Sequence, residues 1–86
     1  MPAPYKLIVQ PSVARDMKSV PKGDRLRILR RVESLPANPR PPGCVKIDDP
    51  ATYRVRQGDY RIVYEIDDHA RIVTIFKIGH RREVYR

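Results

Sequence analysis

The stretch Tyr53-Arg-Val-Arg-Gln-Gly-Asp-Tyr-Arg-Ile-Val-Tyr64 decides the fold, because it predicts a tight β-hairpin. Two β-prone runs flank Gly58-Asp59, and a two-residue turn of this composition is a strong hairpin signal. Such a turn also sets the register, so that Arg56 lies directly opposite Arg61. Side chains alternate between the two faces of a strand. One face therefore carries Tyr53, Val55, Ile62 and Tyr64, and the other carries Arg54, Arg56 and Arg61.

The face that carries Arg54, Arg56 and Arg61 concentrates positive charge in a way that stability alone does not explain. Arg56 opposite Arg61 is a like-charge pair across two strands, which normally destabilises a sheet. A single exposed arginine would be interpreted as a side chain that extends into water at little cost. Three on one face favour an anion-binding site instead, and we expect that anion to be a phosphate backbone.

The chain as a whole is small and basic. Its 86 residues allow a single domain, residues 1–86. The chain is 41% hydrophobic and 33% charged, a composition typical of a folded protein. A net charge of +8 implies acidic partners: nucleic acid, an anionic surface or an acidic protein segment. Cys44 is the only cysteine, which predicts no internal disulfide and a reducing, cytoplasmic location. Since no stretch resembles a signal peptide or a membrane span, we expect no membrane association.

Before the hairpin, the pattern predicts one strand and then two helices. Tyr5 to Gln10 is typical of a strand. The first helix starts at Pro11-Ser12, and Pro21-Lys-Gly interrupts it. Its apolar stripe consists of Val13, Met17 and Val20.

The second helix begins near Asp24, which is placed as a cap or first-turn acid, and Pro36 stops it. Its apolar stripe is predicted to be Ile28, Val32 and Leu35, flanked by Leu26 and Leu29. Its other face is predicted to hold Arg27, Arg30 and Arg31. The two helices therefore form a hairpin that must pack on something apolar.

The remainder of the chain is predicted to be β-structure. Residues 36–43 hold four prolines and predict a surface crossover. Then follow a weak strand from Val45 to Asp48, the hairpin strands Thr52–Gln57 and Tyr60–Ile66, a turn at Asp67–Ala70, and a central strand from Arg71 to Ile78 that ends at Gly79. The order β-α-α-β-β-β predicts an α+β fold, a mostly antiparallel twisted sheet with the helix pair on one face.

Two further clusters contain residues that could carry chemistry. Glu65, Asp67, Asp68 and His69 resemble a metal cluster, but turn acids are common and a calcium loop needs more ligands at regular spacing, so we expect no metal. The tail places His80, Arg81 and Arg82 at the end of the sheet. His80 alone is best interpreted as a surface or capping residue. Tyr85 either packs on the sheet edge or, among guanidinium groups that stabilise a phenolate, accepts a proton.

The element order and three motifs resemble the RelE toxins of bacterial and archaeal toxin–antitoxin modules, within the RelE/ParE superfamily. The motifs are Tyr53-Arg-Val-Arg, Gly58-Asp-Tyr-Arg-Ile-Val-Tyr and Gly79-His-Arg-Arg-Glu-Val-Tyr. The resemblance implies a type II toxin that enters the ribosomal A site and cuts messenger RNA. It implies attack of a ribose 2′-hydroxyl on the adjacent phosphate, with neither metal nor cofactor.

The resemblance also implies roles for individual residues. Arg61 and Arg81 would hold the phosphate, and Tyr85 would transfer the proton or stack on a base. Arg54 and Arg56 would bind the RNA backbone. Family members often have lysine at these positions. Because arginine does not readily release a proton, we expect neither arginine to act as a general base. His80 would bind the RNA phosphate or act as an alternative proton carrier, and Arg82 would bind phosphate. The remaining candidates, on the second helix, would contact ribosomal RNA or antitoxin or form a solvated face: Arg27, Arg30 and Arg31.

Partners and alternatives follow from the same resemblance. A cognate antitoxin would wrap the toxin with an acidic, amphipathic segment that folds on binding, giving a hetero-oligomer. The first alternative is a ParE-like inhibitor of DNA gyrase, a protein-binding toxin without nuclease chemistry. The second is a nucleic-acid-binding module that has lost catalysis.

Overall fold

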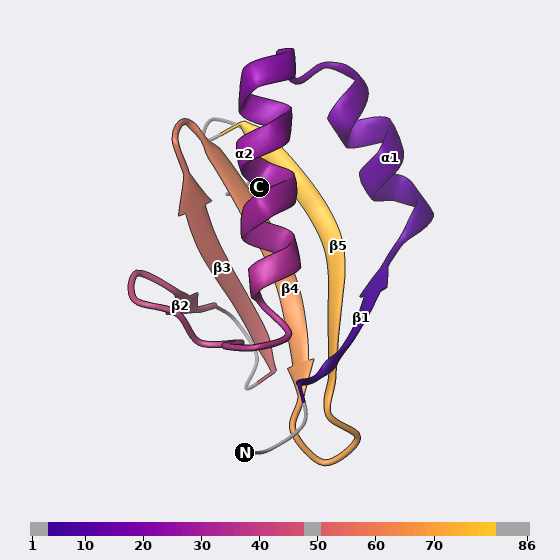
Figure 1. The fold of residues 1–86 in the computed structure, drawn as a ribbon, viewed down its shortest axis with the longest axis vertical. Coiled ribbons are helices and arrows are strands. Elements are labelled where there is room, and N and C mark those ends of the chain that lie inside the picture. Colours follow the sequence, from indigo (N-terminus) through magenta and orange to yellow (C-terminus); the bar gives the residue numbers. More distant parts are fainter. Residues whose placement is uncertain (1–3, 48–50, 81–86) are drawn as a thin grey trace.

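The computed structural model describes residues 4–47 and 51–80. The described elements are β1 (Lys6–Val9), α1 (Pro11–Lys18), α2 (Lys22–Ser34), β2 (Val45–Lys46), β3 (Thr52–Gln57), β4 (Tyr60–Asp67) and β5 (Ile72–His80). The strands form one sheet in the order β1-β5-β4-β3-β2 (Figure 1). β1 runs parallel to β5, and the other neighbours are antiparallel. This is the α+β class that the sequence predicts.

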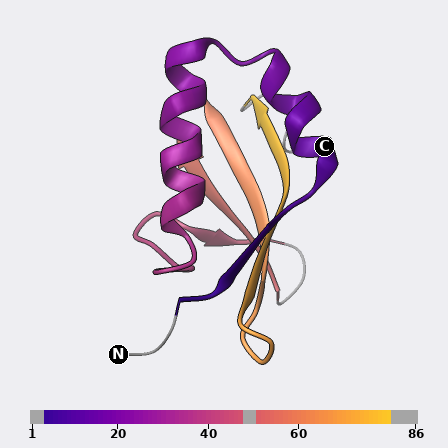
Figure 2. The ribbon, with the colours of Figure 1, turned by 45° about the vertical axis from the view of Figure 1, so that its right-hand side comes forward.

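The molecule has two layers, with both helices on the same side of the sheet (Figure 2). The core lies between these layers, where α1 packs on β5 and α2 packs on β3. Its fully buried side chains are Ile28, Leu35, Val55, Ile62, Tyr64, Val73 and Ile75. Burying a large apolar side chain contributes roughly 1.5–3 kcal/mol, so this layer contact supplies most of the driving force for folding.

The hairpin forms in the predicted register. Arg56 pairs with Arg61, and Gly58 takes a φ of 61°, which glycine adopts without steric cost. Tyr53, Val55, Ile62 and Tyr64 are all buried beneath the helices, as expected. The alternation of the sequence therefore sets which face of the hairpin joins the core.

The last strand is longer than predicted, and the expectation that Gly79 ends it is wrong. β5 continues through Gly79, which pairs with Arg61, to His80, which pairs with Tyr60. The ladder continues because β4 offers partners along its whole length. At its other end β5 begins at Ile72, since Arg71 has a φ of 59° and belongs to the turn. β5 is an interior strand as expected, although β4 occupies the middle of the sheet.

The apolar face of α2 is narrower than predicted. Ile28, Val32 and Leu35 are buried, but Leu26 and Leu29 are 52% and 45% exposed. A helix that packs on a sheet buries one stripe; at about 100° per residue, Leu29 lies beside that stripe and Leu26 on the far side of the helix, so both remain in water. Among the described residues, no helix is long and apolar enough to cross a membrane.

A polar cluster fastens the proline-rich crossover to the turn between β4 and β5. Arg40 donates two hydrogen bonds to Asp68, at 3.2 and 2.7 Å, and a third to the Tyr53 hydroxyl at 3.1 Å. Tyr5 donates to the same Asp68 carboxylate at 2.6 Å. These bonds from Arg40 and Tyr5 lower the pKa of Asp68 from 3.8 to about 2.

We expect Asp68→Asn to lower the melting temperature at neutral pH and to have no effect near pH 2. Because the pKa of Asp68 is depressed in the folded state, its stabilising contribution is present above its ordinary pKa of 3.8 and is lost as the pH falls through about 2. Thermal melts of wild type and variant across this pH range measure the difference. Glu33→Gln, the same change on an exposed helical residue, is the control. A melting difference for Asp68→Asn that persists unchanged near pH 2 would contradict the prediction.

Candidate nucleic-acid interface

Three arginines project from the sheet face opposite the helices. Arg54 and Arg56 stand two residues apart on β3, and Arg61 stands on β4 in register with Arg56. Directly opposed residues of antiparallel strands have Cβ atoms roughly 5 Å apart. The three guanidinium groups therefore start from neighbouring positions on one surface, the arginine face, as the sequence predicts.

The arginines of this face differ in exposure. Arg56 is exposed, Arg54 is half-buried, and Arg61 is only 8% exposed. Val63, two residues from Arg61 on the same face, is 5% exposed. Arg61 is therefore not a side chain that extends freely into water. Instead it is held close to the sheet, with its Nη1 3.4 Å from the Tyr60 carbonyl oxygen.

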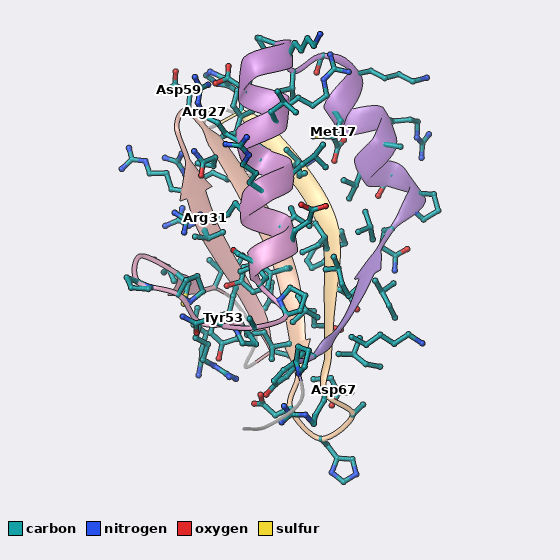
Figure 3. All side chains as sticks on the ribbon, in the orientation of Figure 1. Met17, Arg27, Arg31, Tyr53, Asp59 and Asp67 are labelled. Atoms are coloured by element: carbon teal, nitrogen blue, oxygen red, sulfur yellow. The ribbon has the colours of Figure 1, made fainter. Side chains whose placement is uncertain are left out.

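The α2 arginines do not form one solvated face. Arg27 and Arg30 are exposed, and Arg27 pairs with Asp24 at 3.1 Å. Arg31 is half-buried, and its Nη2 reaches the Arg56 carbonyl oxygen at 3.5 Å. Figure 3 shows Arg27 and Arg31 on the side of α2 that borders β3. Arg31 thus connects the helix to the hairpin strand, which the helical pattern did not reveal because the contact joins residues 25 positions apart.

His80 lies apart from the arginine face. It is paired with Tyr60, whose side chain alternates to the face opposite Arg61, and the His80 and Tyr60 rings meet edge to face with centroids 5.5 Å apart. The other predicted tail residues, Arg81, Arg82 and Tyr85, lie outside the described residues.

Lys77 is a candidate that the sequence reasoning missed. It is exposed on β5 and pairs with Val63, and therefore lies on the same face as Arg54 and Arg61. A bulge in the β4–β5 pairing at Val63/Tyr64 shifts the alternation of β5, so a simple period of two would misplace this side chain.

The arginine face is suited to holding a phosphodiester. Guanidinium groups donate paired hydrogen bonds to phosphate oxygens, and they stay charged at any physiological pH. Cations fixed in advance around a phosphate also stabilise the charge that develops on its oxygens during strand cleavage. In residues 4–47 and 51–80, no three His, Cys, Asp or Glu side chains are grouped as metal ligands.

Comparison with known proteins identifies relatives over nearly the full chain. Residues 7–85 match a family model described as the ParE toxin of the type II toxin–antitoxin system parDE. Toxin RelE of Mycobacterium tuberculosis is 33% identical over 85 residues, covering 96% of this chain and 88% of the relative.

Solved structures show the same fold. A chain of the archaeal RelE–RelB complex from Pyrococcus horikoshii OT3 superposes with a TM-score of 0.81 at 26% identity, covering 92% of this chain and 97% of the other. The toxin–antitoxin complex RelBE2 from Mycobacterium tuberculosis gives a TM-score of 0.77 at 25% identity, covering 91% and 99%.

Proposed function

Because this chain belongs to the RelE/ParE superfamily of toxin–antitoxin toxins, we propose that it cuts messenger RNA on the ribosome. The observation that carries the proposal is the arginine face, where Arg54 and Arg56 stand on β3 and Arg61 stands on β4 in register with Arg56. A like-charge pair is unfavourable for the sheet alone, and a bound phosphodiester would neutralise it.

The proposed reaction is an internal transfer at phosphorus. The ribose 2′-hydroxyl loses its proton and attacks the adjacent phosphorus, a 2′,3′-cyclic phosphate forms, and the 5′-oxygen of the next nucleotide leaves with a proton. Arg61 would hold the non-bridging oxygens as charge accumulates on them, and Arg54 and Arg56 would bind the flanking backbone. Arg81 and Tyr85 are proposed to complete the site as phosphate ligand and as proton carrier or stacking platform.

We also propose an antitoxin partner. Both solved structures described above are toxin–antitoxin complexes. A chain with a net charge of +8 would be neutralised by an acidic, amphipathic antitoxin segment, which would fold as it binds.

One observation supports a second candidate function. The matching family model is described as a ParE toxin, whereas the curated relative quoted above is a RelE toxin. If the chain acts like a ParE toxin, it would inhibit DNA gyrase, and the arginine face would bind a protein surface. The nuclease remains our first proposal, since three guanidinium groups on one sheet face match the needs of phosphate chemistry.

We expect purified toxin to cut a defined messenger RNA only when ribosomes are present. Primer extension in a purified translation system, run with and without ribosomes, would show the cuts, and a gyrase supercoiling assay run in parallel tests the alternative. Stalled complexes with a vacant A site should be cut within the exposed codon. Intact RNA together with inhibited gyrase would overturn the nuclease proposal in favour of the ParE-like function.

A further inference from the structure

The edge of β5 extends beyond its neighbour β1. β1 pairs with β5 only as far as Ile75, whereas β5 continues to His80. Two side chains of α1, one helical turn apart, form hydrogen bonds with the backbone of this uncovered edge. Ser12 Oγ donates to the Phe76 carbonyl oxygen at 3.2 Å, and Asp16 Oδ2 accepts from the Ile78 N–H at 3.0 Å. The helix therefore provides hydrogen-bond partners where a neighbouring strand would otherwise be needed.

A cavity of about 300 Å³ opens at this edge. It is lined by Asp16, Ser19, Val20, Tyr60, Lys77, Ile78, Gly79 and His80. Its wall thus combines a carboxylate from α1 with two aromatic rings, Tyr60 and His80, that meet edge to face. We call this feature the edge cavity.

The edge cavity lies on the helix side of the sheet and the arginine face on the other side, and the two meet at the edge of β5 that β1 leaves uncovered beyond Ile75. Gly79 lines the cavity and is the register partner of Arg61, so the two backbones lie side by side. Lys77 lines the cavity as well and belongs to the same sheet face as Arg61. A base of RNA bound at Arg61 would therefore reach the cavity around this uncovered edge of β5.

We infer that the edge cavity binds a nucleobase of the RNA held on the arginine face, and that Asp16 selects bases with an exocyclic amino group. This inference deepens the proposed function and rests on it. The cavity lies at the small end of ligand sites, so it suits a single base. Single-stranded RNA is read in this way, by splaying out a base, packing it against aromatic rings and hydrogen-bonding its edge.

The chemistry of Asp16 predicts which nucleobases the cavity prefers. An ionised carboxylate only accepts hydrogen bonds, and its two oxygens offer about four acceptor positions, so the bond from Ile78 leaves acceptor capacity toward the cavity. Cytosine presents an amino donor at the position where uracil presents a carbonyl oxygen. The two bases have nearly the same size, so the carboxylate distinguishes them by hydrogen bonding alone.

The test is a titration of the ¹⁵N-labelled full-length chain with cytidine 5′-monophosphate and, separately, uridine 5′-monophosphate, followed by amide chemical shifts. We expect CMP to shift the amides of Ile78, Gly79 and His80 and to bind about tenfold more tightly than UMP, the effect of one hydrogen bond to a charged group. Asp16→Asn keeps an acceptor for Ile78 and adds an amide donor. We therefore expect that variant to lose or reverse the preference for CMP.

Asp24→Asn is the matched control, because it makes the same change in charge on α2, away from the cavity. It should leave the preference for CMP intact. Equal binding of CMP and UMP by wild type, or shifts that do not include Ile78 to His80, would overturn the inference without any variant. Since the titration needs no ribosome, it distinguishes failure of the edge cavity from failure of the nuclease proposal, which the primer-extension assay tests separately.

Discussion

Arg61→Ala is expected to reduce ribosome-dependent cleavage by on the order of 10²-fold or more, the usual effect of removing a fixed donor from a developing oxyanion. Arg61 is the least exposed arginine of the arginine face, at 8%, and it is held next to the Tyr60 carbonyl. A cation positioned before the substrate arrives loses little freedom when the phosphate binds. Single-turnover cleavage measured by primer extension gives the magnitude, and relief of growth arrest gives the cellular consequence.

Two comparisons make this result specific. Arg15→Ala removes the same charge from an exposed position of α1 and should leave cleavage near wild type. Arg61→Lys keeps the charge but loses the paired donors, so an intermediate rate would identify phosphate geometry as the contribution of Arg61. Wild-type cleavage by a folded Arg61→Ala protein would remove Arg61 from the proposed site.

Ile62→Ala, at the neighbouring residue, is expected to act on stability instead. Ile62 is 0% exposed and lies on the opposite face of β4, within the core. Truncating a buried isoleucine to alanine costs about 2–5 kcal/mol, a large share of the 5–15 kcal/mol by which a typical domain is stable. At roughly 4–8 °C per kcal/mol for a domain of this size, the melting temperature should fall by at least about 8 °C. Urea denaturation and thermal melts measure both quantities.

Leu26→Ala is the matched control for the core substitution, since it also shortens an aliphatic side chain to alanine. Leu26 is 52% exposed on α2, so its truncation should change the free energy of unfolding by less than about 0.5 kcal/mol. Equal losses for Ile62→Ala and Leu26→Ala would show that the two faces of the structure are assigned incorrectly.

Features that depend on neighbours in the chain were predictable. The turn at Gly58-Asp59 and the alternation of the strands beside it give the register of Arg56 with Arg61. The same alternation places Tyr53 and Tyr64 in the core. Each of these follows from a turn geometry and a period of two, which operate over a few residues.

Features that depend on distant contacts were not predictable. The sequence predicts that the last strand ends at Gly79, but the strand continues because β4 supplies partners as far as Tyr60. The helical pattern places Arg31 on the outer face of α2, but its side chain reaches the Arg56 carbonyl oxygen. The bulge that brings Lys77 to the arginine face cannot be recognised from the alternation of apolar and polar residues. The assignments of Arg81, Arg82 and Tyr85 lie outside the described residues and remain predictions.

By itself, the sequence determined the element order, the hairpin register and the face that carries Arg54, Arg56 and Arg61, because turns and side-chain alternation are local properties of the backbone. Only the tertiary structure decided how deeply Arg61 is buried and which groups line the edge cavity. Asp16 meets the Ile78 N–H across 62 residues of chain, and such a contact exists only after α1 has packed on β5. Burial and long-range hydrogen bonds are properties of the packed layers, and no period in the sequence encodes them.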